Sequence, residues 1–126
     1  MMPLAATLGI EIDSVTPDEV VGRLAWAAGL CTAAGVLHGG ALVSLADSVA
    51  AICAFVNLPE GAGTSTIESK TNFFAPVRGG VVVATARPLH VGRSVIVVQT
   101  DLFHGKPGDG DRRRVGQTTQ TQAVLR

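Results

Sequence analysis

The sequence predicts an α+β fold in which an antiparallel sheet curls around one long central helix. Three observations lead to this prediction. The apolar stretch from Gly39 to about Val56 is too long for an ordinary strand and has the composition of a helix. Four segments with strand character follow it in succession, joined by glycine-containing turns, and two more precede it. A sheet curled around such an apolar helix would bury it on nearly every side.

The segment before the helix is expected to hold one short helix and two strands. Residues 3–8 predict the short helix. Residues 9–15 and 19–27 alternate well enough for two strands, and Thr16-Pro17-Asp18 is the turn between them. Residues 28–37, rich in Ala and Gly, are expected to form a loop that leads into the long helix.

Residues 57–63 carry a proline and two glycines and end the long helix. The four strands expected after them are residues 64–74, 80–91, 94–104 and 115–125. Residues 105–114 form a long hairpin tip with three consecutive arginines and nearby aspartates. A solvated loop is one interpretation of this tip, and a contact with a ligand phosphate from a neighbouring subunit is the other.

Composition limits the classes of function. The chain has 126 residues, 47% of them hydrophobic and 16% charged, with a formal net charge of zero. This length suits a single domain, residues 1–126, and the high apolar content favours a homo-oligomer. The balanced charge argues against a general nucleic-acid or membrane-surface binder. The first residues lack the features of a signal peptide, and the two cysteines have no metal-binding spacing, so we expect a cytoplasmic protein with reduced thiols.

Asp47 is the most informative residue of the chain. It lies in the middle of the apolar helix, where a carboxylate is costly unless it is paired, hydrogen-bonded or close to water. It follows Gly39 by eight residues, roughly 12 Å along the helix axis, which is too far for a role in capping the helix. Another function must therefore explain it: a catalytic one, or a hydrogen-bonded aspartate at a subunit interface.

Two motifs together resemble a known family. Leu37-His38-Gly39-Gly40 is followed, nine residues after the histidine, by Asp47, and the segment 68–76 ends in Asn-Phe-x-x-Pro. This pattern is similar to the hotdog-fold acyl-CoA thioesterases, and most similar to the phenylacetate-degradation type and its hydroxybenzoyl-CoA relatives. The resemblance covers the chain from about residue 35 to the end.

The resemblance implies a six-stranded antiparallel sheet wrapped around the long helix, in a dimer that pairs two sheets and commonly assembles into a tetramer. It also implies an active site at the dimer interface. The glycine at the start of the helix would come from one subunit and the helix carboxylate from the other. The substrate would be an acyl-CoA, with no separate cofactor because CoA is part of the substrate.

The chemistry of thioester hydrolysis fits these residue types. The N–H of Gly39 at the helix N-terminus can donate to the negative charge that develops on the thioester oxygen. Asp47 would act as a general base on water or as a nucleophile. The resemblance places His38 beside the thioester carbonyl. The alternatives are that His38 hydrogen-bonds the backbone at the helix start and that Gly39 and Gly40 only form a tight turn.

Two threonines are further candidates for the catalytic set. Relatives often carry Asn or Gln six residues before the histidine, where this chain has Thr32, whose hydroxyl is shorter. Ten residues before Pro76, where relatives often have Ser or Thr near the attacking water, the chain has Thr66. Threonine is also an ordinary strand residue, so Thr66 has a structural alternative.

The CoA portion is expected at the turn formed by Val91, Gly92, Arg93 and Ser94, with Gly40 as a further binding residue. Gly92 would allow close approach and Arg93 would meet a phosphate, although a Gly-Arg hairpin turn is also a plain structural element. Arg78 and Lys106 are further phosphate candidates. No metal site is expected, because His90 and His104 lack a suitably spaced carboxylate or cysteine.

Two other functions stay open: a hotdog enoyl-thioester hydratase and a non-catalytic acyl-CoA binding or sensing protein. The helix-start pattern fits the thioesterases better than the hydratases, and sensors usually carry an attached DNA-binding segment. The acyl group is also open between aryl, short-chain and medium-chain types. Trp26 and Phe55 are interpreted as core or interface residues, although Phe55 could wall an acyl pocket.

Overall fold

The structure, a computed structural model, describes residues 2–126 and folds them into one sheet, two α-helices and a short 3-10 helix. In chain order the elements are α1 (Pro3–Leu8), β1 (Glu11–Val15), β2 (Val20–Ala25), η1 (Ala28–Leu30), α2 (Gly39–Phe55), β3 (Gly63–Phe73), β4 (Val81–Val91), β5 (Val95–His104) and β6 (Arg113–Leu125). The predicted elements are confirmed in type and order. Two details differ: the loop before α2 contains η1, and β6 starts earlier than expected because Arg113 and Arg114 still pair with the end of β5.

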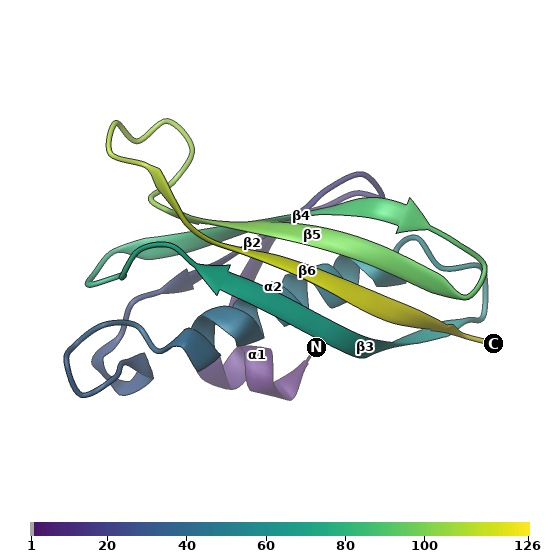
Figure 1. The fold of residues 1–126 in the computed structure, drawn as a ribbon, viewed down its shortest axis with the longest axis horizontal. Coiled ribbons are helices and arrows are strands. Elements are labelled where there is room, and N and C mark those ends of the chain that lie inside the picture. The colour runs from purple at the N-terminus through teal and green to yellow at the C-terminus, as the bar shows by residue number, and fades with distance from the viewer. Residues whose placement is uncertain (1) are drawn as a thin grey trace.

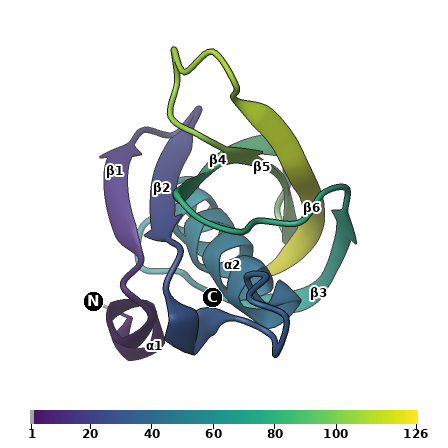
Figure 2. The same cartoon turned by 90° about the vertical axis from the view of Figure 1, so that its left-hand side faces the viewer.

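All six strands belong to one antiparallel sheet with the order β1-β2-β4-β5-β6-β3. The sheet curls around α2, and α1 lies beside β1 (Figures 1 and 2). The predicted α+β architecture is therefore confirmed. This strand order makes β1 and β3 the two edges of the sheet, on opposite sides of the helix.

The inner face of the sheet buries α2. One side of the helix is fully enclosed, with Leu45, Val49 and Cys53 at zero exposure. Close packing depends on small residues: a Cβ on Gly22 of β2 would lie 2.8 Å from Cγ2 of Val49. Burial also raises the pKa of the Cys53 thiol to about 11, which keeps this thiol neutral and unreactive at physiological pH.

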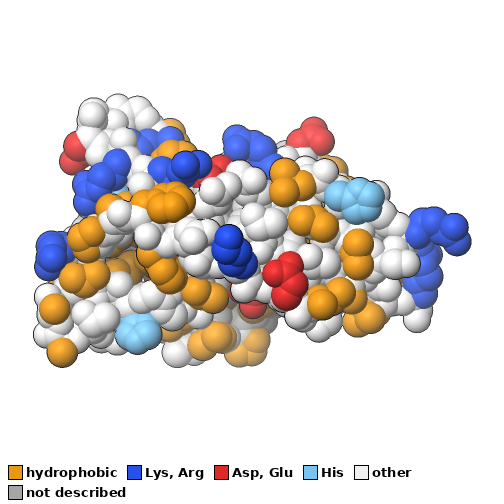
Figure 3. Space-filling view, viewed as in Figure 1, with side chains coloured by type: hydrophobic (Ala, Val, Ile, Leu, Met, Phe, Trp, Pro, Cys, Tyr) orange, Lys and Arg blue, Asp and Glu red, His pale blue; other side chains and the backbone are white. Residues whose placement is uncertain are grey.

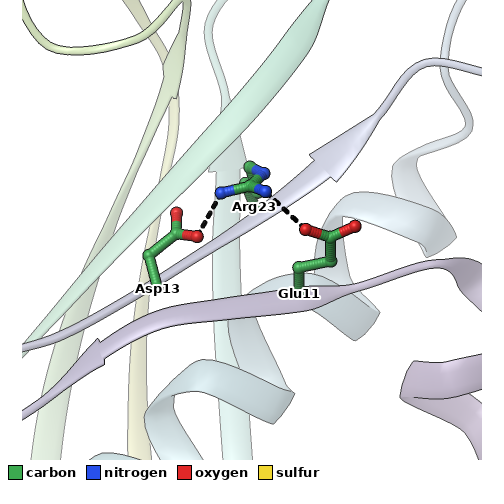
Figure 4. A network of polar contacts seen from close by, with 3 residues as sticks. All are labelled: Glu11, Asp13 and Arg23. Carbon is green, nitrogen blue, oxygen red and sulfur yellow. Dashed lines mark hydrogen bonds and ion pairs between the residues drawn. The ribbon is translucent and has the colours of Figure 1, made fainter.

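The β1 edge is held by ion pairs. The guanidinium of Arg23 on β2 lies between the carboxylates of Glu11 and Asp13 on β1 and forms an ion pair with each (Figure 4). These pairs are partly exposed, so each contributes little to the free energy of unfolding. Their effect is to place charge on one face of the β1–β2 pair. None of the helices formed by residues 2–126 has the length and hydrophobicity needed to cross a membrane.

Candidate active site

His38 is the N-cap of α2. The N–H of Gly40 donates a 2.8 Å hydrogen bond to Nδ1 of His38, so the imidazole caps the first turn of the helix. Because Nδ1 accepts this bond, the neutral ring carries its proton on Nε2. A Cβ on Gly40 would lie 3.0 Å from Nδ1, so the absence of a side chain there leaves space for the cap. His38 thus has the backbone-bonding role, and its Nε2–H is left at an exposed position.

Gly39 presents a backbone donor at the start of α2. The N–H of Gly39 has no hydrogen-bond acceptor within residues 2–126, as expected for the first turn of a helix. A Cβ here would lie 3.2 Å from Cζ of Phe73, at the end of β3. The glycine therefore brings the helix start close to the aromatic ring and keeps the N–H approachable. The positive end of the helix dipole reinforces this donor.

Asp47 lies half-buried on α2 and is oriented by two strands. Its Oδ1 accepts hydrogen bonds from the hydroxyl of Thr66 on β3 at 2.8 Å and from Nε2 of Gln120 on β6 at 2.9 Å. For the part of the chain that the structure describes, no donor contacts Oδ2. One carboxylate oxygen is thus fixed by protein donors, while the other is left to accept a bond from water or substrate.

Two glutamines that the sequence did not single out complete this network. Gln120 and Gln122 are fully buried, and Nε2 of Gln120 also donates to Oε1 of Gln122 at 2.8 Å. The Thr66 hydroxyl lies 2.7 Å from the same Oε1, so its single proton is shared between this acceptor and Asp47. Polar residues occupy both faces of β6, and only the register of β6 with β3 shows which of them point inward.

Thr32 lies with Gly39 on a small apolar hollow. This Gly39 pocket, of about 400 Å³, is lined by Thr32, Val36, Leu37, Gly39, Leu42, Phe73, Phe74, Ala75, Pro76 and Val77. The hydroxyl of Thr32 accepts a weak 3.4 Å bond from the N–H of Ala34, and the side chain is exposed. Thr32 is therefore close enough to share a ligand with Gly39.

The turn of residues 91–94 lies at the other end of the subunit from Gly39. It is closed by a 2.9 Å hydrogen bond from the N–H of Gly92 to the carbonyl of Val95. Val95 pairs with Ala123 near the end of β6, whereas Phe73, beside Gly39, pairs with Gly116 near its start. Figure 1 shows this separation, with the start of α2 on the left and the β4–β5 turn on the right.

Arginines gather at the end of the molecule that holds the Gly39 pocket. The guanidinium of Arg114 lies 5.2 Å from the ring centroid of Phe74, and Nη2 of Arg113 donates to the carbonyl of Pro76 at 3.4 Å. Figure 3 shows basic side chains at this end, below the loop between β5 and β6, and others over the middle of the molecule and at the opposite end. Asp101 pairs with Arg114 at 3.4 Å and neutralises part of this charge.

A single chain therefore holds two separate groups of candidate residues, called half-sites below. One contains His38, Gly39, Gly40 and Thr32, and the other contains Asp47 and Thr66. Eight residues of helix separate Gly39 from Asp47, roughly 12 Å along the axis, so one small substrate group cannot touch both in the same subunit. Among the described residues, no cluster of three His, Cys, Asp or Glu side chains could hold a metal ion.

Comparison with known proteins gives a consistent result. The family model described as the thioesterase superfamily matches residues 34–110. The sequence is similar to a 1,4-dihydroxy-2-naphthoyl-CoA hydrolase of Listeria monocytogenes, 35% identical over 96 residues that cover 76% of this chain and 78% of that protein. The fold is similar to a thioesterase family protein from Silicibacter pomeroyi, with a TM-score of 0.91 and 29% identity over 98% of this chain and 90% of that one. It is also similar to a thioesterase from Haemophilus influenzae, with a TM-score of 0.88 and 28% identity over 97% and 82% of the two chains.

Proposed function

The chain belongs to the thioesterase superfamily, and we propose that it hydrolyses an acyl-CoA at a site shared by two subunits. It has the hotdog fold of this superfamily and is a thioester hydrolase. The observation that carries this proposal is the geometry of Asp47. A carboxylate held on one oxygen by Thr66 and Gln120, with its other oxygen free, is positioned for a reaction rather than for the stability of the helix.

The open β3 edge supports a shared site. β3 has eleven residues, most of them exposed, and one of its borders has no neighbouring strand within the described chain. A second copy that pairs antiparallel with it, centred on Ser69, would bring Phe73 close to Thr66 of the partner subunit, because the register shift between Thr66 and Glu68 displaces the pairing by one residue there. Because Phe73 contacts Gly39 and Thr66 holds Asp47, this pairing would join the two half-sites. Each dimer would contain two such sites.

The proposed reaction uses water and protein groups alone. The thioester carbonyl accepts a hydrogen bond from the N–H of Gly39, and the carboxylate of the other subunit's Asp47 takes a proton from water as the water oxygen bonds to the carbonyl carbon. The C–S bond then breaks, and the CoA thiolate recovers the proton from Asp47. In the alternative route, Asp47 attacks the carbonyl carbon, the C–S bond breaks and releases the CoA thiolate, and water then hydrolyses the resulting mixed anhydride to the free acid and the Asp47 carboxylate.

The remaining residues have supporting roles in this proposal. His38 keeps the helix start in place through its cap and directs Nε2–H outward, where it is available to the thioester oxygen. Thr66 orients Asp47, and Thr32 and Gly40 border the approach to Gly39. The antiparallel pairing of β3 would bring the partner's 91–94 turn toward the same end as Gly39. This supports the expected contact of Gly92 and Arg93 with CoA.

The wider setting follows from the same proposal. CoA enters as part of the substrate, so no separate cofactor is needed. We place the reaction in the cytoplasm, where the two free cysteines stay reduced. The half-exposed Val95 and Val97 on the outer side of β5 and the exposed Leu89 of β4 support a further pairing of dimers into a tetramer.

The test is release of CoA thiol from a panel of acyl-CoAs by wild type and by Asp47→Asn. Asparagine keeps the bonds from Thr66 and Gln120 but cannot accept a proton, so kcat should fall on the order of 100- to 10,000-fold. Asp18→Asn, at an exposed turn, is the matched control and should keep full activity. Near-full activity of Asp47→Asn would rule out the mechanism. A folded wild type without turnover on any acyl-CoA would favour a binding protein.

A further inference from the structure

A second apolar hollow lies beyond Asp47 on α2. This Phe55 pocket, of about 650 Å³, lies between α1, β1, the end of α2 and the start of β3 and is lined by Met2, Pro3, Ala5, Ile10, Ile12, Ala51, Ile52, Phe55 and Thr64. Its volume is in the range of small-ligand pockets. The sequence favours a core or interface position for Phe55; the residue is 62% exposed, so it is not a core residue of the chain, and its place at an interface stays a prediction. Its ring walls the pocket.

The Phe55 pocket begins where the proposed reaction takes place. Ala51 and Phe55 follow Asp47 by four and eight residues, so all three lie on the same face of α2, with Ala51 roughly 6 Å along the axis from Asp47. Thr64 precedes Thr66 by two residues on β3 and points to the same side of the strand. A group attached to a carbonyl beside Asp47 can therefore enter this pocket directly.

The lining offers hydrocarbon contacts and little else. Eight of the nine lining residues are apolar and none is charged. The one hydroxyl, on Thr64, donates to the carbonyl of Ala123 at 2.8 Å and accepts from Nε2 of Gln122 at 3.2 Å. A polar substituent placed in the pocket would lose its water without gaining a free partner, which is unfavourable. An unsubstituted hydrocarbon chain would lose nothing.

The Gly39 pocket differs in its surroundings. The guanidinium groups of Arg113 and Arg114 lie at its border, against Pro76 and Phe74. Guanidinium groups suit the phosphates of CoA and do not suit a hydrocarbon. The two pockets thus divide the substrate, with the anionic end directed toward the arginines and the apolar end toward Phe55.

We propose that the Phe55 pocket binds the acyl group and that this acyl group is an unsubstituted aliphatic chain. The inference rests on the proposed thioesterase function and narrows its substrate class. It differs from what the Listeria relative's name states, a hydroxylated naphthoyl group. We expect kcat/KM to rise about fourfold for each methylene that the pocket buries, until the acyl chain reaches the end of the pocket.

The test compares kcat/KM across acetyl-, butyryl-, hexanoyl-, octanoyl- and decanoyl-CoA in wild type and two variants. Ala51→Leu fills the pocket next to Asp47, and Ile12→Trp fills it from an exposed position of β1, where a larger side chain is less able to disturb folding. Both variants should lose about tenfold or more on octanoyl-CoA and little on acetyl-CoA. Ala6→Leu, at an exposed position of α1, is the matched control and should keep the wild-type profile.

A second comparison tests polarity at constant length. Wild type should hydrolyse hexanoyl-CoA on the order of tenfold more efficiently than 6-hydroxyhexanoyl-CoA, since the hydroxyl finds no free partner in the pocket. Hydrolysis with the same chain-length profile in wild type, Ala51→Leu and Ile12→Trp would overturn the inference and leave the thioesterase function standing. Absence of hydrolysis with every acyl-CoA would overturn the proposed function and the inference with it.

Discussion

The two edges of the sheet differ in a way that bears on function. β1 has only five residues, and its Glu11 and Asp13 form ion pairs with Arg23 of β2; a register shift is present in both edge strands, between Ile12 and Ser14 in β1 and between Thr66 and Glu68 in β3. β3 has eleven residues, and Ile67 and Phe73 are 59% and 51% exposed on it. Short strands, bulges and charges protect an edge from pairing, whereas a long and mostly uncharged strand invites it. The contrast is the reason to propose that a second copy pairs with β3 and not with β1.

The same contrast explains why the half-sites are incomplete. The residues that hold Asp47 come from β3 and β6, and the ring beside Gly39 comes from the end of β3. No predicted catalytic residue lies on β1. In the proposed dimer, an antiparallel copy of β3 would bring the Gly39 half-site of one subunit to the Asp47 half-site of the other. Substitutions in the two edge strands distinguish them.

The largest effect is expected from proline substitutions in β3. The N–H groups of Ser69 and Lys70 point to opposite borders of the strand, so one of Ser69→Pro and Lys70→Pro removes only the outward donor. That variant should become monomeric and lose more than about 100-fold in activity, because each site loses the half supplied by the partner. Sedimentation velocity and CoA release measure the two effects.

The matched pair in β1 is Ser14→Pro and Val15→Pro. The better tolerated of these variants should stay dimeric and within about twofold of wild-type activity, because proline is accepted on a solvent-facing edge. If proline reduced dimerisation and activity to a similar extent in β1 and in β3, the proposed distinction between the two edges would be wrong. Melting temperatures separate a lost interface from a general loss of folding.

Subunit mixing should produce the next largest effect. Asp47→Asn and Gly39→Val each disable a different half-site, and each homodimer should be nearly inactive. After the two are unfolded and refolded together, half of the dimers are mixed, and each mixed dimer has one intact site out of two. The mixture should therefore recover up to about one quarter of wild-type activity.

The control for mixing is each variant unfolded and refolded alone. A mixture no more active than the sum of its parents would mean that Gly39 and Asp47 act within one subunit. That outcome would contradict the shared site while leaving Asp47 as the catalytic carboxylate. The roughly 12 Å of helix between the two residues is the physical reason to expect recovery.

Much of the fold could be predicted from the sequence. The helix from Gly39 and the strand order along the chain follow from apolar periodicity and from glycine and proline positions, which are local signals. The start of β6 was misplaced by two residues because Arg113 and Arg114 look like loop residues, whereas their strand conformation comes from pairing with His104 and Phe103. Pairing between two strands does not appear in the local sequence of either strand.

The candidate site could be predicted only in part. Asp47 stands out because a carboxylate in an apolar helix needs a reason, and His38 and Gly39 stand out through their spacing from it. Gln120 and Gln122 were missed because both faces of β6 are polar, so no alternation marks the inward side. Their role appears only when the register with β3 places Gln122 opposite Thr66.

The smallest expected effect concerns the register of the β3 interface. A pairing centred on Ser69 sets Glu68 of each subunit opposite Lys70 of the other, twice in each dimer. Glu68→Lys would create two like-charge pairs, each destabilising by about 0.2–1 kcal/mol, and should raise the dimer dissociation constant by about twofold to 30-fold. The double variant Glu68→Lys with Lys70→Glu reverses both charges and should restore the dimer, whereas Glu60→Lys, in the exposed loop after α2, should change nothing. If the double variant dimerises as weakly as the single one, the strands pair in another register, and the contact between Phe73 and the partner's Thr66 region must be reassigned with it.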